Sequence, residues 1–323
     1  MKEIVIGKNQ CGQRLDKFLL KFLKEAPKSF IYKMLRKKNI KLNGKKAEGK
    51  EKLLEGDVVT LFLAEETLEK FSVDRQKQGE ISGIPDRPLD IIFENEHIAL
   101  IHKPAGMLSQ KAAPGDVSLT EYFSAYVGST EEGFTPGICN RLDRNTSGIV
   151  IGGKTLAGLQ TMSGLLRERG IEKYYIAVVC GRMTQSGILE GWLKKDETTN
   201  KASICRKKEP GSSYIKTGYE PLGTDGNYTV LRVRLFTGKT HQIRSHLASL
   251  SHPIAGDTKY GGRVPGSRIT RQLLHAYELR FPALEPPFGD LSEKRFRAEL
   301  PEDFYREEAV KQLLNQVRKE GRL

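Results

Sequence analysis

Residues 139–154 read CNRLDRNTSGIVIGGK, a polar turn that runs directly into an apolar strand. Asp143 lies in this turn between Arg141 and Arg144, and the flanking cations are expected to favour its ionised form. The threonine and serine that follow suit a tight connection, because their hydroxyls bond nearby backbone groups. The stretch therefore places a carboxylate at the start of a buried strand. An aspartate between arginines is also typical of a structural ion pair, so these residues alone leave both roles open.

The chain around this stretch is rich in short strands. The expected strands are LDIIFE (89–94), HIALIH (97–102), GIVIGG (148–153), KYYIAVVCG (173–181) and YTVLRVRLF (228–236), with helices at TLAGLQTMSGLLRE (155–168) and THQIRSHLASL (240–250). Strands dominate and helices intervene irregularly, which argues against a repeating βαβ array. We predict an α+β domain over residues 89–323, built on a mixed, largely antiparallel β-sheet.

The N-terminal segment has a different texture. GQRLDKFLLKFLKE (12–25) and SFIYKMLRKKN (29–39) place apolar residues at helical spacing. IKLNGKKA (40–47) follows, with Asn43-Gly44 as a hairpin signal, and GDVVTLFL (56–63) supplies another strand. These elements predict a compact unit over residues 1–64. Residues 65–88 are polar, contain two glycines and two prolines after residue 78, and are expected to form a linker.

Charge separates the two parts further. Residues 1–63 hold 16 Lys+Arg and 7 Asp+Glu, a net charge of +9, out of +13 for all 323 residues. A basic segment on a nearly balanced body is typical of a polyanion-binding module. On the second helix, Lys33, Arg36 and Lys37 share one face because they lie three and four positions apart.

This N-terminal segment resembles the S4 RNA-binding domain, which has an RLDKFL pattern, a basic second helix and a VNG-like turn (here LNG). The resemblance implies that the second helix and the turn after it form the RNA surface. The candidate RNA-binding residues are Lys33, Arg36, Lys37, Lys38 and Lys45.

Three other functional classes are disfavoured. GIVIGGKT (148–155) has phosphate-loop spacing, but its central residues form a strand where a phosphate cradle needs a flexible loop. His241 and His246 lack the glutamate of the zinc-protease motif, and the four cysteines lie far apart, so no metal site is expected. No apolar run is long enough to span a membrane and no secretory signal is apparent, so we expect a cytoplasmic protein.

The turn and strand at 139–154 resemble the catalytic signature of the RluA-type pseudouridine synthases, R-L-D-x-x-T-S-G. Further similar segments follow in family order: IHKPAGM (101–107), KYYIAVV (173–179), TGKTHQIRSHLA (237–248), PIAGDTKYGG (253–262) and LLHAYELRF (273–281). The resemblance spans residues 89–282 and places Asp143, Tyr175 and Arg244 on the family's active-site aspartate, tyrosine and arginine. An S4 domain before such a domain fits the branch that modifies large-subunit ribosomal RNA.

The resemblance implies how these residues act. Asp143 would be the catalytic carboxylate, with Arg244 pairing to it in a bidentate geometry. Tyr175 would stack on the base or assist proton removal, and Arg141 would help extrude the base. Taken alone, Arg244 could instead contact phosphate and Tyr175 could pack in the core. Two residues depart from the family: Asn140 replaces a histidine, and Lys239 replaces an arginine.

We therefore predict an RNA pseudouridine synthase, an isomerase that uses an aspartate and no cofactor. Its partner would be structured RNA, most simply ribosomal RNA, and it would act as a monomer. A non-catalytic, ribosome-associated RNA-binding protein is the alternative from another functional class. The sequence does not identify the target uridines or the atom that Asp143 attacks.

Overall fold

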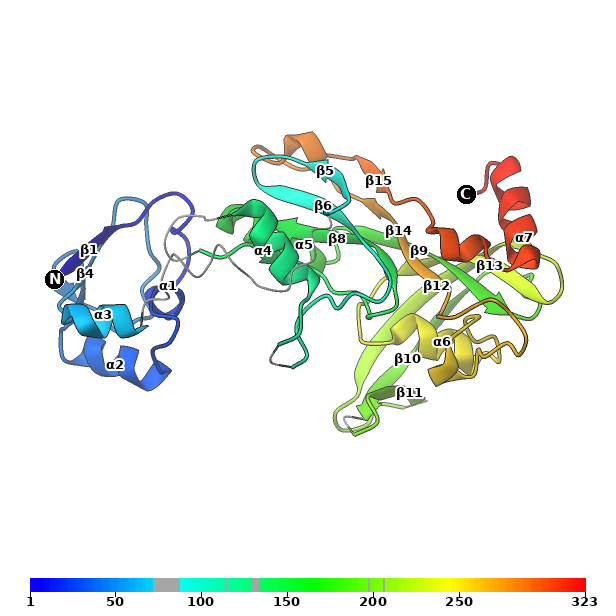
Figure 1. Ribbon diagram of the computed structural model, residues 1–323, viewed down its shortest axis with the longest axis horizontal. Coiled ribbons are helices and arrows are strands. Elements are labelled where there is room, and N and C mark those ends of the chain that lie inside the picture. The colour runs from blue at the N-terminus through cyan, green and yellow to red at the C-terminus, as the bar shows by residue number, and fades with distance from the viewer. Residues whose placement is uncertain (72–87, 114, 129–133, 197, 206) are drawn as a thin grey trace.

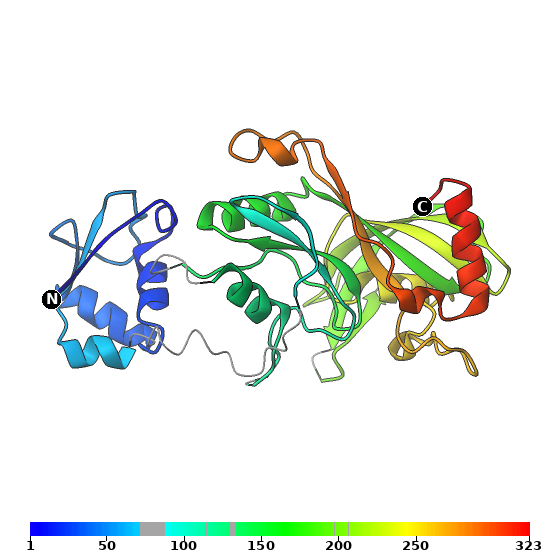
Figure 2. The same ribbon diagram turned by 45° about the horizontal axis from the view of Figure 1, so that its top comes forward.

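The protein has an N-terminal unit at one end of a larger sheet domain (Figure 1). The computed structural model describes residues 1–71, 88–113, 115–128, 134–196, 198–205 and 207–323. Helices α4 and α5 lie at the end of the larger domain that is nearest the N-terminal unit, and α7 lies at the opposite end (Figures 1 and 2). Among the described residues, no helix is long and apolar enough to cross a membrane.

The N-terminal unit packs helices on a small antiparallel sheet of strand order β1-β4-β2-β3. Its elements are β1 (Lys2–Val5), α1 (Leu15–Phe22), α2 (Lys28–Arg36), β2 (Ile40–Leu42), β3 (Lys45–Lys46), β4 (Val58–Leu61) and α3 (Glu65–Phe71). The predicted apolar stripes are confirmed, because α1 buries Leu15, Phe18 and Leu19, and α2 buries Ile31 and Leu35. The core of this unit lies between the two stripes and the sheet.

The hairpin between β2 and β3 turns where the sequence predicts. Asn43 and Gly44 have φ values of 50° and 72°, as a two-residue hairpin turn requires. The Asn43 side chain also accepts a hydrogen bond from the Val58 amide at 2.8 Å and donates one to Asp57 at 2.8 Å. The turn is therefore tied to the neighbouring strand β4.

The predicted start of the linker is wrong by seven residues. Residues 65–71 form α3, whose Leu68 and Phe71 pack on the core of the N-terminal unit. The rings of Phe30 and Phe71 lie 4.7 Å apart. These two apolar contacts outweigh the polar composition of the segment. The N-terminal unit thus extends to Phe71, and residues 72–87 of the predicted linker lie outside the described residues.

The larger domain contains the remaining described elements. They are β5 (Ile91–Glu94), β6 (Ile98–Lys103), α4 (Leu119–Val127), β7 (Gly137–Ile138), β8 (Ser147–Gly153), α5 (Leu156–Arg167), β9 (Glu172–Cys180), β10 (Gly187–Asp196), β11 (Lys201–Cys205), β12 (Ser213–Thr224), β13 (Tyr228–Leu235), α6 (Gln242–Ser249), β14 (Leu274–Arg280), β15 (Arg295–Arg297) and α7 (Glu308–Lys319), with short 3-10 helices η2 (Thr258–Tyr260), η3 (Gly289–Leu291) and η4 (Glu302–Tyr305). Every strand and helix predicted for this domain is present.

The strands form one sheet of eleven strands in the described part of the chain. The main path runs β11-β10-β12-β13-β9-β14-β8-β6-β5, with β15 beside β14 and β7 beside β8. Of the strand pairs described, β8 with β14 is the parallel one and the others are antiparallel. This confirms the predicted α+β class with a mixed, largely antiparallel sheet.

The parallel pair β8–β14 is in close contact at a glycine. Gly148 has a φ of 116°, and a Cβ atom built there would lie 2.2 Å from the backbone oxygen of Ala276. No residue with a side chain fits at this point. The pair matters because β8 begins directly after the turn that contains Asp143.

Apolar clusters cover both faces of the sheet. One cluster contains Tyr175, Leu231 and Val233 and packs against Ile243 and Leu247 of α6. On the other face, alternate residues of β9 and β13 pack against α7. Helix α6 therefore lies on the same face as Tyr175, which brings its N-terminus close to the edge where β8 begins.

Candidate active site

Asp143 lies in a turn that is held by hydrogen bonds on both sides. The Thr146 amide donates to the Asp143 carbonyl at 3.0 Å, and the Gly106 amide donates to the Arg144 carbonyl at 2.9 Å. Ser109 bonds both the amide and the carbonyl of Leu142 through its Oγ atom, at 2.9 and 2.8 Å. The backbone is thus fixed, and the Asp143 side chain remains 24% exposed. A carboxylate in this position is ordered and still reachable from outside.

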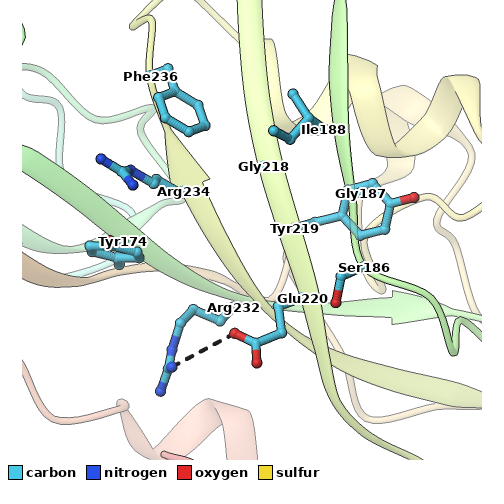
Figure 3. A pocket seen from close by; sticks show the side chains of 10 residues that line it. All are labelled: Tyr174, Ser186, Gly187, Ile188, Gly218, Tyr219, Glu220, Arg232, Arg234 and Phe236. Atoms are coloured by element: carbon cyan, nitrogen blue, oxygen red, sulfur yellow. Dashed lines mark ion pairs between the residues drawn. The ribbon is translucent and has the colours of Figure 1, made fainter.

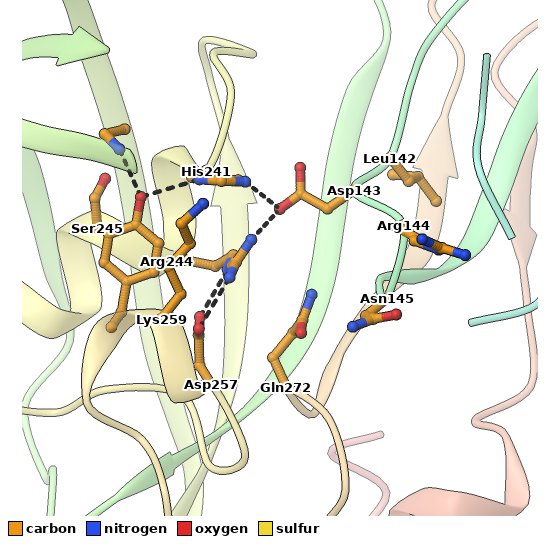
Figure 4. Close-up of polar contacts among 12 residues, drawn as sticks. Leu142, Asp143, Arg144, Asn145, His241, Arg244, Ser245, Asp257, Lys259 and Gln272 are labelled. Carbon is orange, nitrogen blue, oxygen red and sulfur yellow. Dashed lines mark hydrogen bonds and ion pairs between the residues drawn. The ribbon is translucent and has the colours of Figure 1, made fainter. Parts of the chain in front are cut away.

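The cation that meets Asp143 comes from α6. Arg244 Nη1 donates to Asp143 Oδ2 at 2.9 Å (Figure 4). The expectation that Arg141 and Arg144 hold this carboxylate is wrong. Both are exposed, Arg144 Nε donates to the Gly106 carbonyl, and Arg141 lies 3.5 Å from Gln110. A charge 101 positions along the chain therefore replaces the two adjacent ones.

The bidentate partner of Arg244 is Asp257. Arg244 Nε donates to Asp257 Oδ2 at 2.7 Å, and Nη2 donates to Oδ1 at 2.9 Å. The predicted bidentate contact with Asp143 is wrong, since only one N–H of Arg244 faces it. Burial would lower the pKa of Arg244, but the two carboxylates outweigh it and the pKa is raised. The guanidinium is thus permanently charged, anchored by one aspartate and directed at the other.

Tyr175 lies in β9 and is near enough to Asp143 to interact with its charge. It is buried in the same apolar cluster as Leu142 and Ile243. Burial, and then the nearby charge of Asp143, raise the pKa of its phenol. Its hydroxyl makes no hydrogen bond with any described residue. The ring of Tyr175 thus packs in the core, while its hydroxyl has no hydrogen-bond partner among the described residues, so both roles weighed for this residue stay open.

His241 also reaches Asp143. Its Nε2 atom is 3.8 Å from Asp143 Oδ2, and its Nδ1 atom is 3.0 Å from the Tyr260 hydroxyl. The Ala202 amide donates to that hydroxyl at 2.8 Å, which leaves the hydroxyl proton free to be donated to Nδ1. This arrangement places the imidazole proton on Nε2, facing the carboxylate. Burial, the main cause, lowers the pKa of His241, which favours the neutral ring.

Two buried cations hold the carbonyls that follow Asp143. Lys103 Nζ donates to the carbonyls of Pro104, Met107 and Arg144 at 2.8 to 3.1 Å. Arg271 Nη1 donates to the Asn145 carbonyl at 3.0 Å, and the same guanidinium binds Asp303. These contacts fix the backbone of the two residues that follow Asp143.

Lys103 provides a test of this arrangement through pH. Burial, and then Arg271, lower its pKa from 10.5 to about 7, while Asp143 acts in the opposite direction. At a pH between these two pKa values, Lys103 is protonated in the unfolded chain and largely neutral in the folded protein. Its contribution to the unfolding free energy therefore increases as pH rises. We expect the unfolding free energy of the native protein to increase relative to Lys103→Met by up to a few kcal/mol between pH 7 and pH 10.

The comparison requires urea unfolding of both proteins at several pH values in that range. Titrating groups that do not interact with Lys103 are the same in both proteins, so their contributions cancel in the difference. A difference that stays constant with pH would show that Lys103 keeps an ordinary pKa in the fold.

Sequence reasoning missed several of these residues. Lys103, His241 and Asp257 lie inside the quoted motifs IHKPAGM, TGKTHQIRSHLA and PIAGDTKYGG, so a signal for them existed. Arg271 lies just outside a motif and had no signal. Two residues differ from the pattern of the resembled family. Asn140 Oδ1 accepts a hydrogen bond from the Ile151 amide at 2.8 Å and so supports β8. Lys239 is exposed, and its ammonium has no partner among the described residues.

The predicted RNA-binding residues lie mainly in the N-terminal unit. Those five side chains are exposed and make no ion pair with a described residue: Lys33, Arg36, Lys37, Lys38 and Lys45. Arg141, the sixth, is exposed beside the Asp143 turn. The structure therefore leaves all six available to a polyanion, in two separate places.

Other predicted exclusions can be compared with the structure. GIVIGGKT forms β8 and the start of α5, and Lys154 binds Glu94 at 2.6 Å.

A hollow of about 410 Å³ is lined by Tyr174, Tyr219, Arg232, Arg234 and Phe236 (Figure 3). Tyr174 and Arg234 alternate along their strands with Tyr175 and Val233, so these two lining residues lie on the opposite face of the sheet from the cluster that contains Tyr175. Its arginines are paired with Glu172 and Glu220.

Comparison with known proteins gives consistent results. Residues 97–249 match the family described as RNA pseudouridylate synthase, and residues 13–59 match the S4 domain. The chain is 32% identical over 290 residues to ribosomal large subunit pseudouridine synthase C of Vibrio vulnificus, covering 87% of this chain and 89% of the relative. It is 31% identical to the protein of that name from Escherichia coli K12, covering 98% and 97%.

Among solved structures, the chain is similar to human RNA pseudouridylate synthase domain containing 4. The TM-score is 0.55 at 21% sequence identity, and the match covers 67% of this chain and 92% of the human one. At this identity the similarity concerns the fold.

Proposed function

Because this chain belongs to the RNA pseudouridylate synthase family, we propose that it converts specific uridines of large-subunit ribosomal RNA to pseudouridine, with Asp143 as the reacting carboxylate and without a cofactor. Its family and relatives make it an enzyme, an isomerase, so the non-catalytic alternative is set aside. The observation that supports the site is the contact of Asp143 with Arg244, a partly exposed carboxylate on a buried, anchored cation.

The reaction requires little beyond a placed carboxylate. The bond between N1 of uracil and C1′ of ribose breaks, the base turns, and C5 bonds to C1′. The proton of C5 is then lost and N1 gains one, so product and substrate are isomers and no electron is exchanged with another reagent. Asp143 either attacks the sugar or stabilises positive charge on it as the bond breaks.

Arg244 and Tyr175 would support this chemistry in different ways. Arg244 would direct one oxygen of Asp143, because its other hydrogen-bonding N–H groups donate to Asp257. Tyr175 is close enough to Asp143 for the carboxylate charge to raise the pKa of its phenol. Its hydroxyl has no partner among the described residues, so it could contact the base or assist removal of a proton from it. Both roles depend on a base that has left its stack, as chemistry at a glycosidic bond requires.

RNA selection would come from shape and unpaired loops. We propose that the basic surface of α2 and the turn after it bind phosphates of structured ribosomal RNA, and that Arg141 contacts RNA beside the target. The relatives are named for the ribosomal large subunit, which supports this substrate. A monomer working in the cytoplasm would be sufficient, since Asp143, Arg244 and Tyr175 come from one chain.

The proposal is tested by incubating the purified protein with large-subunit ribosomal RNA, without added nucleotide, and mapping pseudouridine at each position. New pseudouridine at a small number of defined positions is expected. Absence of any product on full-length ribosomal RNA and on its fragments would contradict the proposed substrate.

The basic surface of α2 predicts a salt effect. Replacing Lys33, Arg36 and Lys37 together by glutamine should weaken RNA binding and flatten its dependence on salt. Each lost phosphate contact releases fewer counterions, so the slope of log affinity against log salt should fall by roughly one unit per contact. Binding is measured at several salt concentrations.

The matched control replaces three exposed lysines far from this surface by glutamine: Lys294, Lys311 and Lys319. This variant loses the same charge and should keep the native slope. If both variants behave alike, the effect belongs to net charge and not to a binding surface on α2.

A further inference from the structure

Gln272 is a buried residue whose side-chain amide has no hydrogen-bond partner in the described part of the chain. It is 4% exposed and lies two residues before β14. Its amide makes no hydrogen bond with any described residue. Burying an amide without a partner costs free energy, so such groups are uncommon. Four described residues have a side-chain polar atom that is both unpaired and fully shielded from solvent: His102, Thr146, His246 and Tyr305. Gln272 is not one of them, so its unpaired amide atoms keep some contact with solvent.

Gln242 shows how the same side chain looks when its role is structural. It is 2% exposed, and its Oε1 atom accepts from Thr237 and from the Lys239 amide. Its Nε2 atom donates to the Lys216 carbonyl and to Thr217. The side-chain amide of Gln242 thus accepts two hydrogen bonds and donates two, whereas that of Gln272 makes none with the described residues.

The amide of Gln272 points into the active site. In Figure 4 its side chain rises from the segment entering β14 toward the space between the Arg244–Asp257 pair and the turn of Asp143 and Asn145. The strand register explains this placement, because β14 runs parallel to β8 with His275 opposite Ser147. The residues before both strands therefore share one edge. Arg271 Nη1 joins the two segments by donating to the carbonyls of Asn145 and Gln272.

We propose that Gln272 is a substrate-contacting residue that hydrogen-bonds the imide edge of the flipped uracil, which rests on the proposed function. A carboxamide offers an acceptor and a donor side by side. The imide edge of uracil presents an N–H beside a carbonyl, so both groups can be bonded at once. No other buried amide in the described part of the chain is both unpartnered and directed at Asp143.

Depth favours the base over the ribose as its partner. Asp143 must lie beside the sugar in the proposed reaction, and its side chain is 24% exposed. On the scale of whole-residue exposure Gln272 is buried at 4% and Asp143 is only half-buried, so Gln272 is the less accessible of the two. A flipped nucleotide enters base first and remains tied to the RNA through its sugar, so the deeper group meets the base.

The test is Gln272→Met in the full chain, which keeps length and removes both hydrogen bonds. We expect the single-turnover rate on ribosomal RNA to fall roughly 10- to 100-fold, because the N–H and carbonyl of the bound uracil would then lie against methionine without a hydrogen-bond partner. RNA affinity should stay within about two-fold, since most of it comes from phosphate contacts. The unfolding temperature should be unchanged or higher, because no intramolecular bond is lost.

Gln242→Met is the matched control for stability and should lower the unfolding temperature. Gln272→Asn, which keeps the amide but shortens its reach, should show a smaller rate loss than Met and serves if the Met variant does not fold. Equal rates for the native protein and Gln272→Met would overturn the proposal. If the native protein forms no pseudouridine, the proposed function fails instead, so the two failures are distinguishable.

A substrate with 2′-deoxyuridine at the target position separates base from ribose. If Gln272 contacts the base, the ratio of native to Gln272→Met rates stays the same on this RNA. If the ratio falls to about one, the amide contacts the 2′-hydroxyl and the base assignment is wrong.

Discussion

Asp143→Asn is expected to lower the single-turnover rate of pseudouridine formation by at least about 10³-fold. Asparagine has almost the same shape, but it provides neither a nucleophilic oxygen nor a negative charge beside the sugar. Folding should survive, because Arg244 keeps its bidentate contact with Asp257 and is not left unpaired. RNA affinity should remain within about two-fold, since phosphate contacts supply most of it.

Three measurements on the same preparation check this result: pseudouridine formed under single-turnover conditions, RNA binding, and the unfolding temperature. Asp290→Asn is a suitable control, because this aspartate is exposed in η3 and bonds Asn95, which lies near the Ile98–Gly153 pair at the end of β8 remote from Asp143. It should behave as the native protein does. A variant Asp143→Asn with near-native rate would show that the carboxylate is not the reacting group.

Arg244→Lys should reduce the rate by about 10²- to 10³-fold although the charge is kept. Arg244 uses three N–H groups in fixed directions, one toward Asp143 and two toward Asp257. A lysine ammonium is a compact charge on a flexible chain and cannot hold both carboxylates in these positions. Loss of buried, charge-assisted hydrogen bonds should also cost about 1–3 kcal/mol of unfolding free energy.

The decisive comparison is between rate and RNA affinity. Arg244 is 7% exposed, which leaves little surface for a phosphate, so affinity should change far less than the rate. Arg318→Lys, at an exposed arginine that binds Glu299, is the matched control and should alter neither. A variant Arg244→Lys whose main defect is weaker binding would make Arg244 a phosphate contact, the alternative that its sequence context left open.

Local patterns predicted local structure well. The Asn43-Gly44 turn, the apolar stripes of α1 and α2, and the buried strand β8 all follow from the spacing of a few neighbouring residues. Prediction was weaker where packing overrides composition. The segment that became α3 is mostly polar, and only Leu68 and Phe71, which reach the core of the N-terminal unit, reveal why it is helical.

The sequence by itself determined the two-part organisation, the largely antiparallel sheet and, through its motifs, the identity of Asp143, Tyr175 and Arg244 as one candidate site. Only the tertiary structure decided which groups meet. Asp143 is held by Arg244 and approached by His241, not by its neighbours Arg141 and Arg144. Asp257 takes the bidentate contact, and Gln272 faces the site with no hydrogen-bond partner among the residues that the structure describes. The physical reason is that the contacts of Asp143 with Arg244 and His241 join segments about a hundred residues apart. They depend on the parallel pairing of β8 with β14 and on the packing of α6 against the sheet, and no local spacing specifies either.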